Sequence, residues 1–231
     1  MTSLHLLSGG AAQGLVTQLQ GQFQAQSGCT IQGDFGAVGL MKDRLLARAP
    51  CDVIILTQAL IEQLIASGHV LAGSAQSLGV VKTGVAVKTG EASPKVDSPL
   101  ALKAALLAAR GIYFPDPVKA TAGIHFMNVL KRLGIDTELA SRLHSFPNGA
   151  TAMREMAQAT GAGLMGCTQV TEILYTPGVQ LVAPLPKEFE LATGYTAAVC
   201  TQAGQPQAAT ELIGLLISPE AASLRRSGGF E

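Results

Sequence analysis

A regular alternation of short apolar segments with amphipathic segments constrains this chain most. Residues 4–7 form an apolar run that ends in a Ser-Gly-Gly turn, and Leu15, Leu19 and Phe23 then follow at a spacing of four, as on one face of a helix. Residues 52–56 (Asp-Val-Ile-Ile-Leu) form a continuous run of the kind found in strands buried on both faces of a parallel sheet. Strands and helices that alternate at this spacing predict βαβ units and therefore an α/β, doubly wound fold.

After the third predicted helix the rhythm changes, which indicates a second lobe. Residues 78–81 and 83–87 predict two strands in quick succession, separated only by Lys82. The last predicted strand, residues 196–201, and the helices after it can return to the first lobe. The chain would then cross between the lobes twice, which predicts a two-lobed fold with a hinge and an inter-lobe cleft. Lobe 1 is predicted to comprise residues 1–81 plus 192–231, and lobe 2 residues 82–191.

The composition argues against several classes of partner and cofactor. Lys and Arg number 16 and Asp and Glu also number 16, whereas domains that bind nucleic acid usually carry a basic excess. No apolar run reaches the roughly 18 residues of a membrane span. The histidines are widely spaced in no metal-binding pattern, so we expect no metal ion and no other cofactor. The cysteines are too dispersed for a disulfide framework or a CxxC site and are expected to be buried free thiols: Cys29, Cys51, Cys167 and Cys200.

The N-terminal segment bears on where the protein acts. It has no basic stretch followed by a long apolar one, so no secretory leader is visible. We therefore expect a cytoplasmic protein as the sequence is written, and a periplasmic one if a leader was removed. An ABC transporter is an expected partner only in the second case.

Four strand-to-helix junctions rich in small residues are the candidate ligand-binding segments. Each leaves unpaired backbone N–H groups at a helix N-terminus, where partial positive charge collects and an anion can approach closely. An ordinary tight turn explains any one junction well, but four of them divided between two lobes make an anion site an equally good interpretation. None is a phosphate-binding loop or a full dinucleotide motif. The candidate ligand-binding residues are Ser8, Gly9, Gly10, Ala11, Val38, Gly39, Thr121, Ala122, Gly123, Asn148, Gly149 and, nearby, Gln169.

His125 is the candidate for proton transfer. It lies in the first turn of a predicted helix that faces the expected cleft, shortly after Gly123. It can serve there as a general base or as a donor to an anion, although a partly exposed structural histidine is the favoured alternative. No Gly-x-Ser-x-Gly elbow is present, and no cysteine has an evident histidine partner, so the sequence predicts no nucleophilic catalysis.

Three segments resemble motifs of the molybdate-type periplasmic solute-binding proteins. Residues 48–55 (Arg-Ala-Pro-Cys-Asp-Val-Ile-Ile) resemble the family's G/A-x-P-x-D-[VL]-x-[IV] stretch. Residues 121–123 (Thr-Ala-Gly), with Leu-Lys-Arg-Leu-Gly at 130–134, resemble its P-A-G…L-x-K-L-G pattern. Residues 216–222 followed by 228–230 resemble its C-terminal signature. The resemblance runs in order over essentially the whole chain and implies a type II periplasmic-binding-protein fold, whose cleft closes around a small anion.

The resemblance carries over only part of the family's ligand set. Molybdate binders present serine hydroxyls at the first two junctions, where this chain has Ala11 and Val38, and a tyrosine where it has Gly166. Ala122 and Gly149 match positions that donate backbone N–H groups. A desolvated tetrahedral oxyanion needs many donors, so the loss of three hydroxyls predicts a ligand other than molybdate.

A narrower resemblance is to a subgroup that includes aconitate isomerase. It rests on residues 7–10 (Leu-Ser-Gly-Gly), 52–55, 72–74 (Ala-Gly-Ser), 169–174 (Gln-Val-Thr-Glu-Ile-Leu) and 177–179 (Pro-Gly-Val). It implies a cleft suited to a polycarboxylate, together with proton-transfer chemistry. The leading expectation is a protein that binds a small organic carboxylate. The alternatives are an isomerase of an unsaturated polycarboxylate, with His125 as its base, and a cytoplasmic sensor that docks on a partner.

Overall fold

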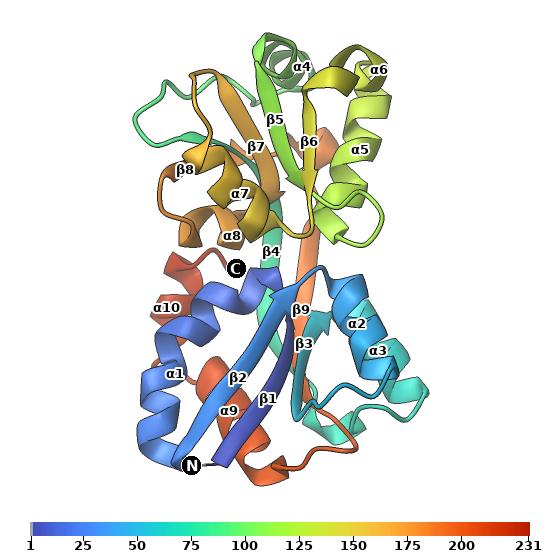
Figure 1. Ribbon diagram of the computed structural model, residues 1–231, viewed down its shortest axis with the longest axis vertical. Helices are drawn as coiled ribbons and strands as arrows, with labels where there is room; N and C mark the ends of the chain where they lie inside the picture. Colours follow the sequence, from blue (N-terminus) through green and yellow to red (C-terminus); the bar gives the residue numbers. More distant parts are fainter. Residues whose placement is uncertain (1) are drawn as a thin grey trace. The chain divides into compact units, whose positions relative to one another are not determined.

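The computed structural model describes residues 2–231, which divide into two compact units. Unit 1 comprises the described residues up to Val81 together with Thr193–Glu231, and unit 2 comprises Lys82–Ala192. The chain leaves unit 1 within strand β4 (Gln76–Lys88) and returns at the start of strand β9 (Ala192–Val199). Strands and helices alternate in both units (Figure 1), so the predicted α/β class is confirmed.

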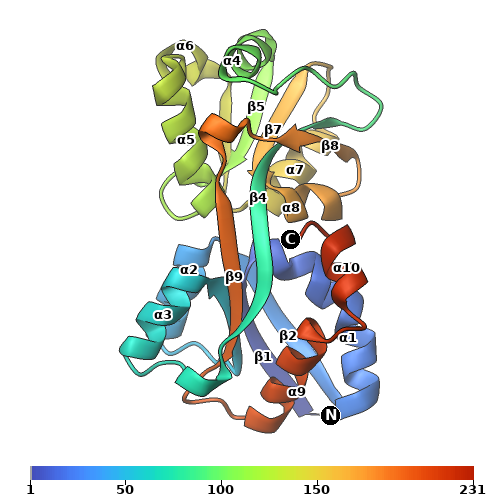
Figure 2. The same cartoon turned by 180° about the vertical axis from the view of Figure 1, so that it is seen from behind.

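Unit 1 is a mainly parallel sheet with helices on both faces. Its elements, besides parts of β4 and β9, are β1 (Thr2–Gly9), β2 (Cys29–Gly36), β3 (Val53–Thr57), α1 (Gln13–Ser27), α2 (Val38–Leu46), α3 (Gln58–Ala66), α9 (Pro206–Ile217) and α10 (Ala222–Ser227). The strand order is β2-β1-β3-β9, with β9 antiparallel to β3 and the other pairs parallel. Helices α2 and α3 lie on one side of these strands, and α1 and α9 lie on the other (Figures 1 and 2).

The core of unit 1 follows from the apolar patterns of the sequence. Residues 53–56 of the central strand β3 are completely buried, because helices cover both faces of the sheet. Leu15, Leu19 and Phe23 of α1 face the same core, as their spacing predicts. Leu212 of α9 joins it from the C-terminal segment.

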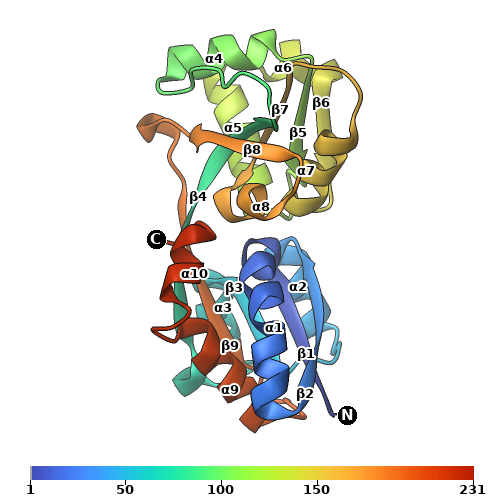
Figure 3. The same ribbon diagram turned by 90° about the vertical axis from the view of Figure 1, so that its left-hand side faces the viewer.

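Unit 2 repeats this plan. Its elements are the remainder of β4, α4 (Pro99–Ala108), β5 (Gly111–Pro115), α5 (Thr121–Leu133), α6 (Asp136–Leu139), β6 (Leu143–Phe146), α7 (Gly149–Gln158), β7 (Leu164–Gln169), α8 (Val170–Tyr175) and β8 (Val179–Pro184). The strand order is β4-β7-β5-β6, and β8 pairs with β4 (Figure 3). Val85 and Val87 of β4 pack into one core with α4 and α5, while Ala86 between them packs into another with α7. This alternation is the two-residue period of a strand buried on both faces.

One prediction at the start of unit 2 is wrong. The two strands expected at residues 78–81 and 83–87 are one continuous strand, β4. Lys82 does not interrupt it, because the Lys82 ammonium lies 3.7 Å from the Glu190 carboxylate and keeps 27% of its side chain exposed. A charged residue can thus occupy a strand without an uncompensated burial penalty.

Candidate ligand-binding site

Within each unit, the strand-to-helix junctions gather at one edge of the sheet. In unit 1, β1 and β2 are parallel neighbours and lead into α1 and α2. In unit 2, β5 pairs in parallel with both β6 and β7, and these three strands lead into α5, α7 and α8. The carboxyl ends of parallel strands share an edge, which is where open α/β sheets bind ligands. The structure thus brings together the predicted junctions of unit 1, and separately those of unit 2.

The two junctions of unit 1 are in direct contact. A Cβ atom placed on Gly9 would lie 2.8 Å from Cγ1 of Val38 and 3.2 Å from the Tyr195 ring, so only glycine fits at the end of β1. Ser8 beside it is completely buried, and its hydroxyl donates to the Gly9 carbonyl at 2.9 Å. The Ser8 oxygen therefore remains available as an acceptor, whereas its proton must leave Gly9 before it can reach an anion.

The helices of unit 1 begin without side-chain caps. Ala12 precedes α1 and Ala37 precedes α2, and neither has a side chain that can accept a hydrogen bond from the first helical turn. The first N–H groups of an α-helix have no partner inside the helix. At α2 these are the N–H groups of Val38, Gly39 and Leu40. Val38 is 7% exposed, and Gly10 and Ala11 are also buried.

In unit 2, the junction between β5 and α5 is fixed by its backbone. A side chain on Gly123 would overlap the carbonyl groups of Pro115 and Asp116, so glycine is needed where the helix packs on the turn. The Asp116 carboxylate accepts from the N–H groups of Val118 at 2.6 Å and Lys119 at 2.9 Å. Ala120 precedes the helix without a side-chain cap, so the first turn formed by Thr121, Ala122 and Gly123 resembles that of α2.

His125 anchors another part of unit 2. Its Nε2 lies 2.7 Å from the Phe189 carbonyl oxygen. A carbonyl only accepts, so Nε2 carries the proton and Nδ1 is the basic nitrogen of the neutral ring. The Arg132 guanidinium lies 4.6 Å from the Phe189 ring centroid and adds a second contact between α5 and this segment. These contacts are compatible with a structural role for His125 and leave its Nδ1 as the nitrogen that can accept a proton.

The junction before α7 is already occupied by groups of the chain itself. The Asn148 side chain accepts from the Thr151 N–H at 2.8 Å and thereby caps the helix. The N–H groups of Gly149 and Ala150 hydrogen bond to the carboxylate of Glu172 in α8. A Cβ atom on Gly149 would collide with Glu172 and Thr168, so glycine is what allows the carboxylate to approach. The Gly149 N–H group, which is predicted to donate to a ligand, therefore already has a partner in the Glu172 carboxyl group.

Glu172 is a buried carboxyl group at these junctions that is absent from the residues predicted from the sequence. Its carboxylate also accepts from the Thr168 hydroxyl at 2.5 Å and from the Gln169 N–H. Burial raises the pKa of Glu172 above its ordinary value, and the hydrogen bonds oppose this without cancelling it. The spacing Gln169-x-x-Glu172 is that of a capping box, in which the third helical residue reaches back to the N-cap N–H, and this signal could have identified it.

Three buried side chains at the start of α8 and on the neighbouring strand β4 hold polar atoms without a hydrogen-bond partner. They are the Thr83 hydroxyl, both amide atoms of Gln169 and the Thr171 hydroxyl, on residues that are 1%, 3% and 5% exposed. Thr83 of β4 is paired directly with Gln169 of β7, so the two side chains project from the same face of the sheet. Buried polar groups are nearly always hydrogen bonded, so unpartnered ones need an explanation. No sequence pattern singles out Thr83 as a site residue, because its proximity to Gln169 arises only when β4 pairs with β7.

Three general features of residues 2–231 concern metal ions, membranes and thiols. In that part of the chain, no group of three or more His, Cys, Asp or Glu side chains could hold a metal ion. No helix among the described residues has the length and apolar character needed to cross a bilayer. All four cysteines are buried and free, as predicted.

Comparison with known proteins gives one family and one fold. Residues 4–231 match the family model of the bacterial extracellular solute-binding protein. The chain is 26% identical over 242 residues to aconitate isomerase of Pseudomonas sp., covering 100% of this chain and 88% of that protein.

Solved structures agree at the level of the fold. A periplasmic molybdate-binding protein of Azotobacter vinelandii matches with a TM-score of 0.79 at 20% identity, covering 99% of this chain and 98% of that one. The sulfate-binding protein SubI of Mycobacterium tuberculosis matches with a TM-score of 0.76 at 17% identity, covering 100% and 86%. Because the family model spans nearly the whole chain, this protein belongs to the bacterial extracellular solute-binding proteins and has the type II periplasmic-binding-protein fold.

Proposed function

We propose that this protein binds a small organic carboxylate at its strand-to-helix junctions. Helix-start N–H groups and buried neutral side chains would supply the hydrogen bonds. Membership of a solute-binding family supports the binding of a small solute, and two structural neighbours are named for the anions molybdate and sulfate. The proposed contacts are Ser8, Gly9, Gly10, Ala11, Val38 and Gly39 from unit 1, and Thr121, Ala122, Gly123, Asn148, Gly149 and Gln169 from unit 2. Of these, Asn148 and Gly149 would first have to release their bonds to Thr151 and Glu172.

The observation that carries the proposal is the unpartnered amide of Gln169 with the hydroxyls of Thr83 and Thr171. Each buried polar atom without a partner destabilises the ligand-free protein by about 1–3 kcal/mol. A carboxylate or hydroxyl group of a ligand can accept from the amide nitrogen and the hydroxyls, and a ligand hydroxyl can donate to the amide oxygen. A set with both donors and acceptors suits a substituted organic acid better than a bare tetrahedral oxyanion.

Three positions at which this chain differs from molybdate binders also favour an organic carboxylate over molybdate as the ligand. Ala11 and Val38 are buried and carry no hydroxyl. At Gly166, a Cβ atom would lie 2.8 Å from the Met153 sulfur, so the space that a tyrosine would enter is filled. In unit 2, the α7 donors are engaged by Glu172, which leaves the uncapped start of α5 as the better source of main-chain N–H groups.

Calorimetry with citrate, cis-aconitate, trans-aconitate, molybdate and sulfate tests this function. We expect a carboxylate to bind more tightly than either inorganic oxyanion. Gln169→Met removes the amide without changing the volume much, so it should weaken binding about 10- to 150-fold. The same change should raise the free energy of unfolding of the ligand-free protein by about 1–3 kcal/mol for each of the two unpartnered atoms that disappear.

Gln180→Met is the matched control. The Gln180 amide donates to the Glu91 carbonyl at 3.0 Å and accepts from the Gly90 N–H at 3.3 Å, so it is satisfied inside unit 2. This variant should lose stability and keep the affinity of the wild type. Micromolar or tighter binding of molybdate, or unchanged binding by Gln169→Met, would contradict the proposal.

A second candidate function is the isomerisation of an unsaturated polycarboxylate. The full-length similarity to aconitate isomerase supports it. Proton transfer next to a carboxylate needs a base within hydrogen-bond reach, and the candidates are Nδ1 of His125 and the carboxyl group of Glu172. NMR of cis-aconitate in deuterated water tests this function through the vinyl proton. Absence of both isomerisation and deuterium uptake would reject it, and full turnover by His125→Ala would exclude that histidine.

The location and partner follow from the same proposal. The family description, extracellular solute-binding protein, supports a site of action outside the cytoplasmic membrane. The partner proposed there is the membrane component of an ABC transporter. Fractionation of cells that express the natural gene would test the location, and a cytoplasmic protein would favour the enzyme or the sensor instead.

A further inference from the structure

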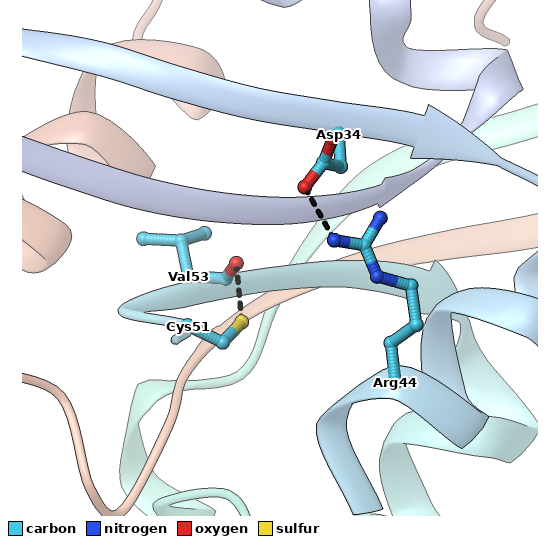
Figure 4. Close-up of polar contacts among 4 residues, drawn as sticks. All are labelled: Asp34, Arg44, Cys51 and Val53. Atoms are coloured by element: carbon cyan, nitrogen blue, oxygen red, sulfur yellow. Dashed lines mark hydrogen bonds and ion pairs between the residues drawn. The ribbon is translucent and has the colours of Figure 1, made fainter. Parts of the chain in front are cut away.

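Two of the four cysteines meet in unit 1, although they are distant in sequence. The sulfur atoms of Cys51 and Cys200 lie 3.4 Å apart, and the residues are separated by 149 positions. The Cys200 thiol donates to the Cys51 sulfur. Figure 4 shows the next contact, in which the Cys51 thiol donates to the Val53 carbonyl at 3.1 Å. The other two thiols are elsewhere, Cys29 at the start of β2 and Cys167 in β7 of unit 2.

The backbone around this thiol pair is held firmly on both sides. The Cys200 N–H donates to the Asp52 carbonyl at 2.9 Å, and Cys200 also forms a bridge with Val70. The Asp52 carboxylate accepts from the N–H groups of His5 at 2.7 Å and Gln205 at 2.8 Å. The two sulfur atoms are therefore presented to each other by a fixed frame, and rotation of the side chains with a small shift would bring them to the roughly 2.05 Å of a disulfide.

We propose that Cys51 and Cys200 form a redox-controlled disulfide that ties the segment before β3 to the end of β9. This goes beyond ligand binding and depends on residues of unit 1 alone. In the G/A-x-P-x-D stretch of the solute-binding motif, Cys51 occupies the unspecified position between Pro50 and Asp52, so the pair is a feature of this chain and not of that motif.

The oxidant is a second disulfide, from a small molecule such as oxidised glutathione or from a disulfide-exchange protein. The Cys51 thiolate attacks one sulfur of that disulfide, forms a mixed disulfide and releases one thiolate. The Cys200 thiolate then attacks the Cys51 sulfur and releases the second thiolate. The two protein thiols are oxidised, losing two protons and two electrons, while the external disulfide that Cys51 attacked is reduced to two thiols.

The surroundings favour Cys51 as the first nucleophile. A cavity of about 240 Å³ reaches the pair and is lined by Arg48 and His69 as well as by both cysteines. Cys51 is 8% exposed and Cys200 only 2%. The hydrogen bond with Cys51, together with burial, raises the pKa of the Cys200 thiol, so Cys200 is the poorer initial thiolate.

Closure of this disulfide links chain segments on either side of unit 2. Residues 82–192 lie entirely within the loop between the two cysteines. In the loop-entropy account, a cross-link over a long loop stabilises the folded state by restricting the unfolded one. The bond is expected to persist where the compartment is oxidising and to be absent in a reducing cytoplasm.

The test uses the full chain carrying Cys29→Ala and Cys167→Ala, so that Cys51 and Cys200 are the remaining thiols. After equilibration with oxidised glutathione, the intact mass should fall by two hydrogen atoms, and no thiol should react with a chromogenic disulfide reagent after unfolding. The melting temperature should rise by about 4–16 °C relative to the same protein in dithiothreitol.

Adding Cys51→Ser or Cys200→Ser provides the controls. Each should abolish the redox-dependent shift in melting temperature and leave a single thiol, free or joined to glutathione. If the folded protein does not react, the same chain is unfolded, reduced and refolded in a glutathione redox buffer. A disulfide formed on refolding still supports the proposal, whereas two free thiols after both treatments overturn it. Because the readouts are mass and stability without ligand, their failure is separate from a failure of carboxylate binding.

Discussion

At the scale of single residues, the buried Glu172 carboxyl makes the stability of unit 2 depend on pH. Burial raises its pKa, although the Thr168 hydroxyl and three N–H groups stabilise the charged form. The pKa of this carboxyl group in the folded protein exceeds its value near 4.5 in the unfolded chain. The folded protein therefore binds the proton more tightly than the unfolded chain does. That stabilisation is complete below the unfolded pKa and is lost as the pH rises through the raised one.

Glu172→Gln should remove this dependence. The amide keeps an acceptor for the α7 N–H groups and carries no charge. Relative to the wild type, the variant should gain about 1.4 kcal/mol for every pH unit between the unfolded and the folded pKa. Thermal unfolding from about pH 5 to pH 8, followed by circular dichroism, measures this gain. Glu155→Gln, on the exposed side of α7, is the matched control for the loss of one carboxyl group. A pH-independent difference for Glu172→Gln would show that the carboxyl titrates alike in both states.

At the scale of elements, the start of α7 shows how an anion-binding geometry can be satisfied internally. Asn148 caps the helix through the Thr151 N–H at 2.8 Å, and Glu172 accepts from the next donors. Asn148→Ala should therefore lower stability by about 1 kcal/mol, which corresponds to roughly 2–4 °C in melting temperature. Asn148→Ser keeps an oxygen at the cap and should recover most of the loss. Equal melting temperatures for the alanine and serine variants would contradict a capping role.

At the scale of the whole molecule, the C-terminal segment completes a core that the N-terminal segment begins. Leu212 of α9 is completely buried with residues of α1 and β3 in unit 1. Leu212→Ala should lower the free energy of unfolding by about 2–5 kcal/mol, since it leaves a cavity in that core. Leu100→Ala, at a position in α4 that is 79% exposed, should change it by less than about 0.5 kcal/mol. Urea denaturation measures both, and similar midpoints would mean that α9 contributes little to unit 1.

The α/β class and the solute-binding family could be predicted from the sequence, because their signals are local. The continuous apolar run at residues 52–56 needs cover on both faces wherever it is placed, and the four-residue spacing of Leu15, Leu19 and Phe23 specifies one helical face. Small residues at the junctions likewise indicate tight strand-to-helix turns. Lys82 was misread as a break between strands, because its compensating partner, Glu190, is far away in sequence.

The sequence by itself thus determined the alternation of strands and helices, the family and the positions of the junctions rich in small residues. Only the tertiary structure decided which of those starts are still free: Glu172 takes the donors of Gly149 and Ala150, whereas α5 begins without a side-chain cap. It also decided that Cys51 meets Cys200 and that Thr83 lies opposite Gln169. The physical reason is that hydrogen bonds and thiol contacts act over only a few ångströms in space. The pairing of strands brings such groups together, and no periodic pattern in the sequence indicates which residues will be paired.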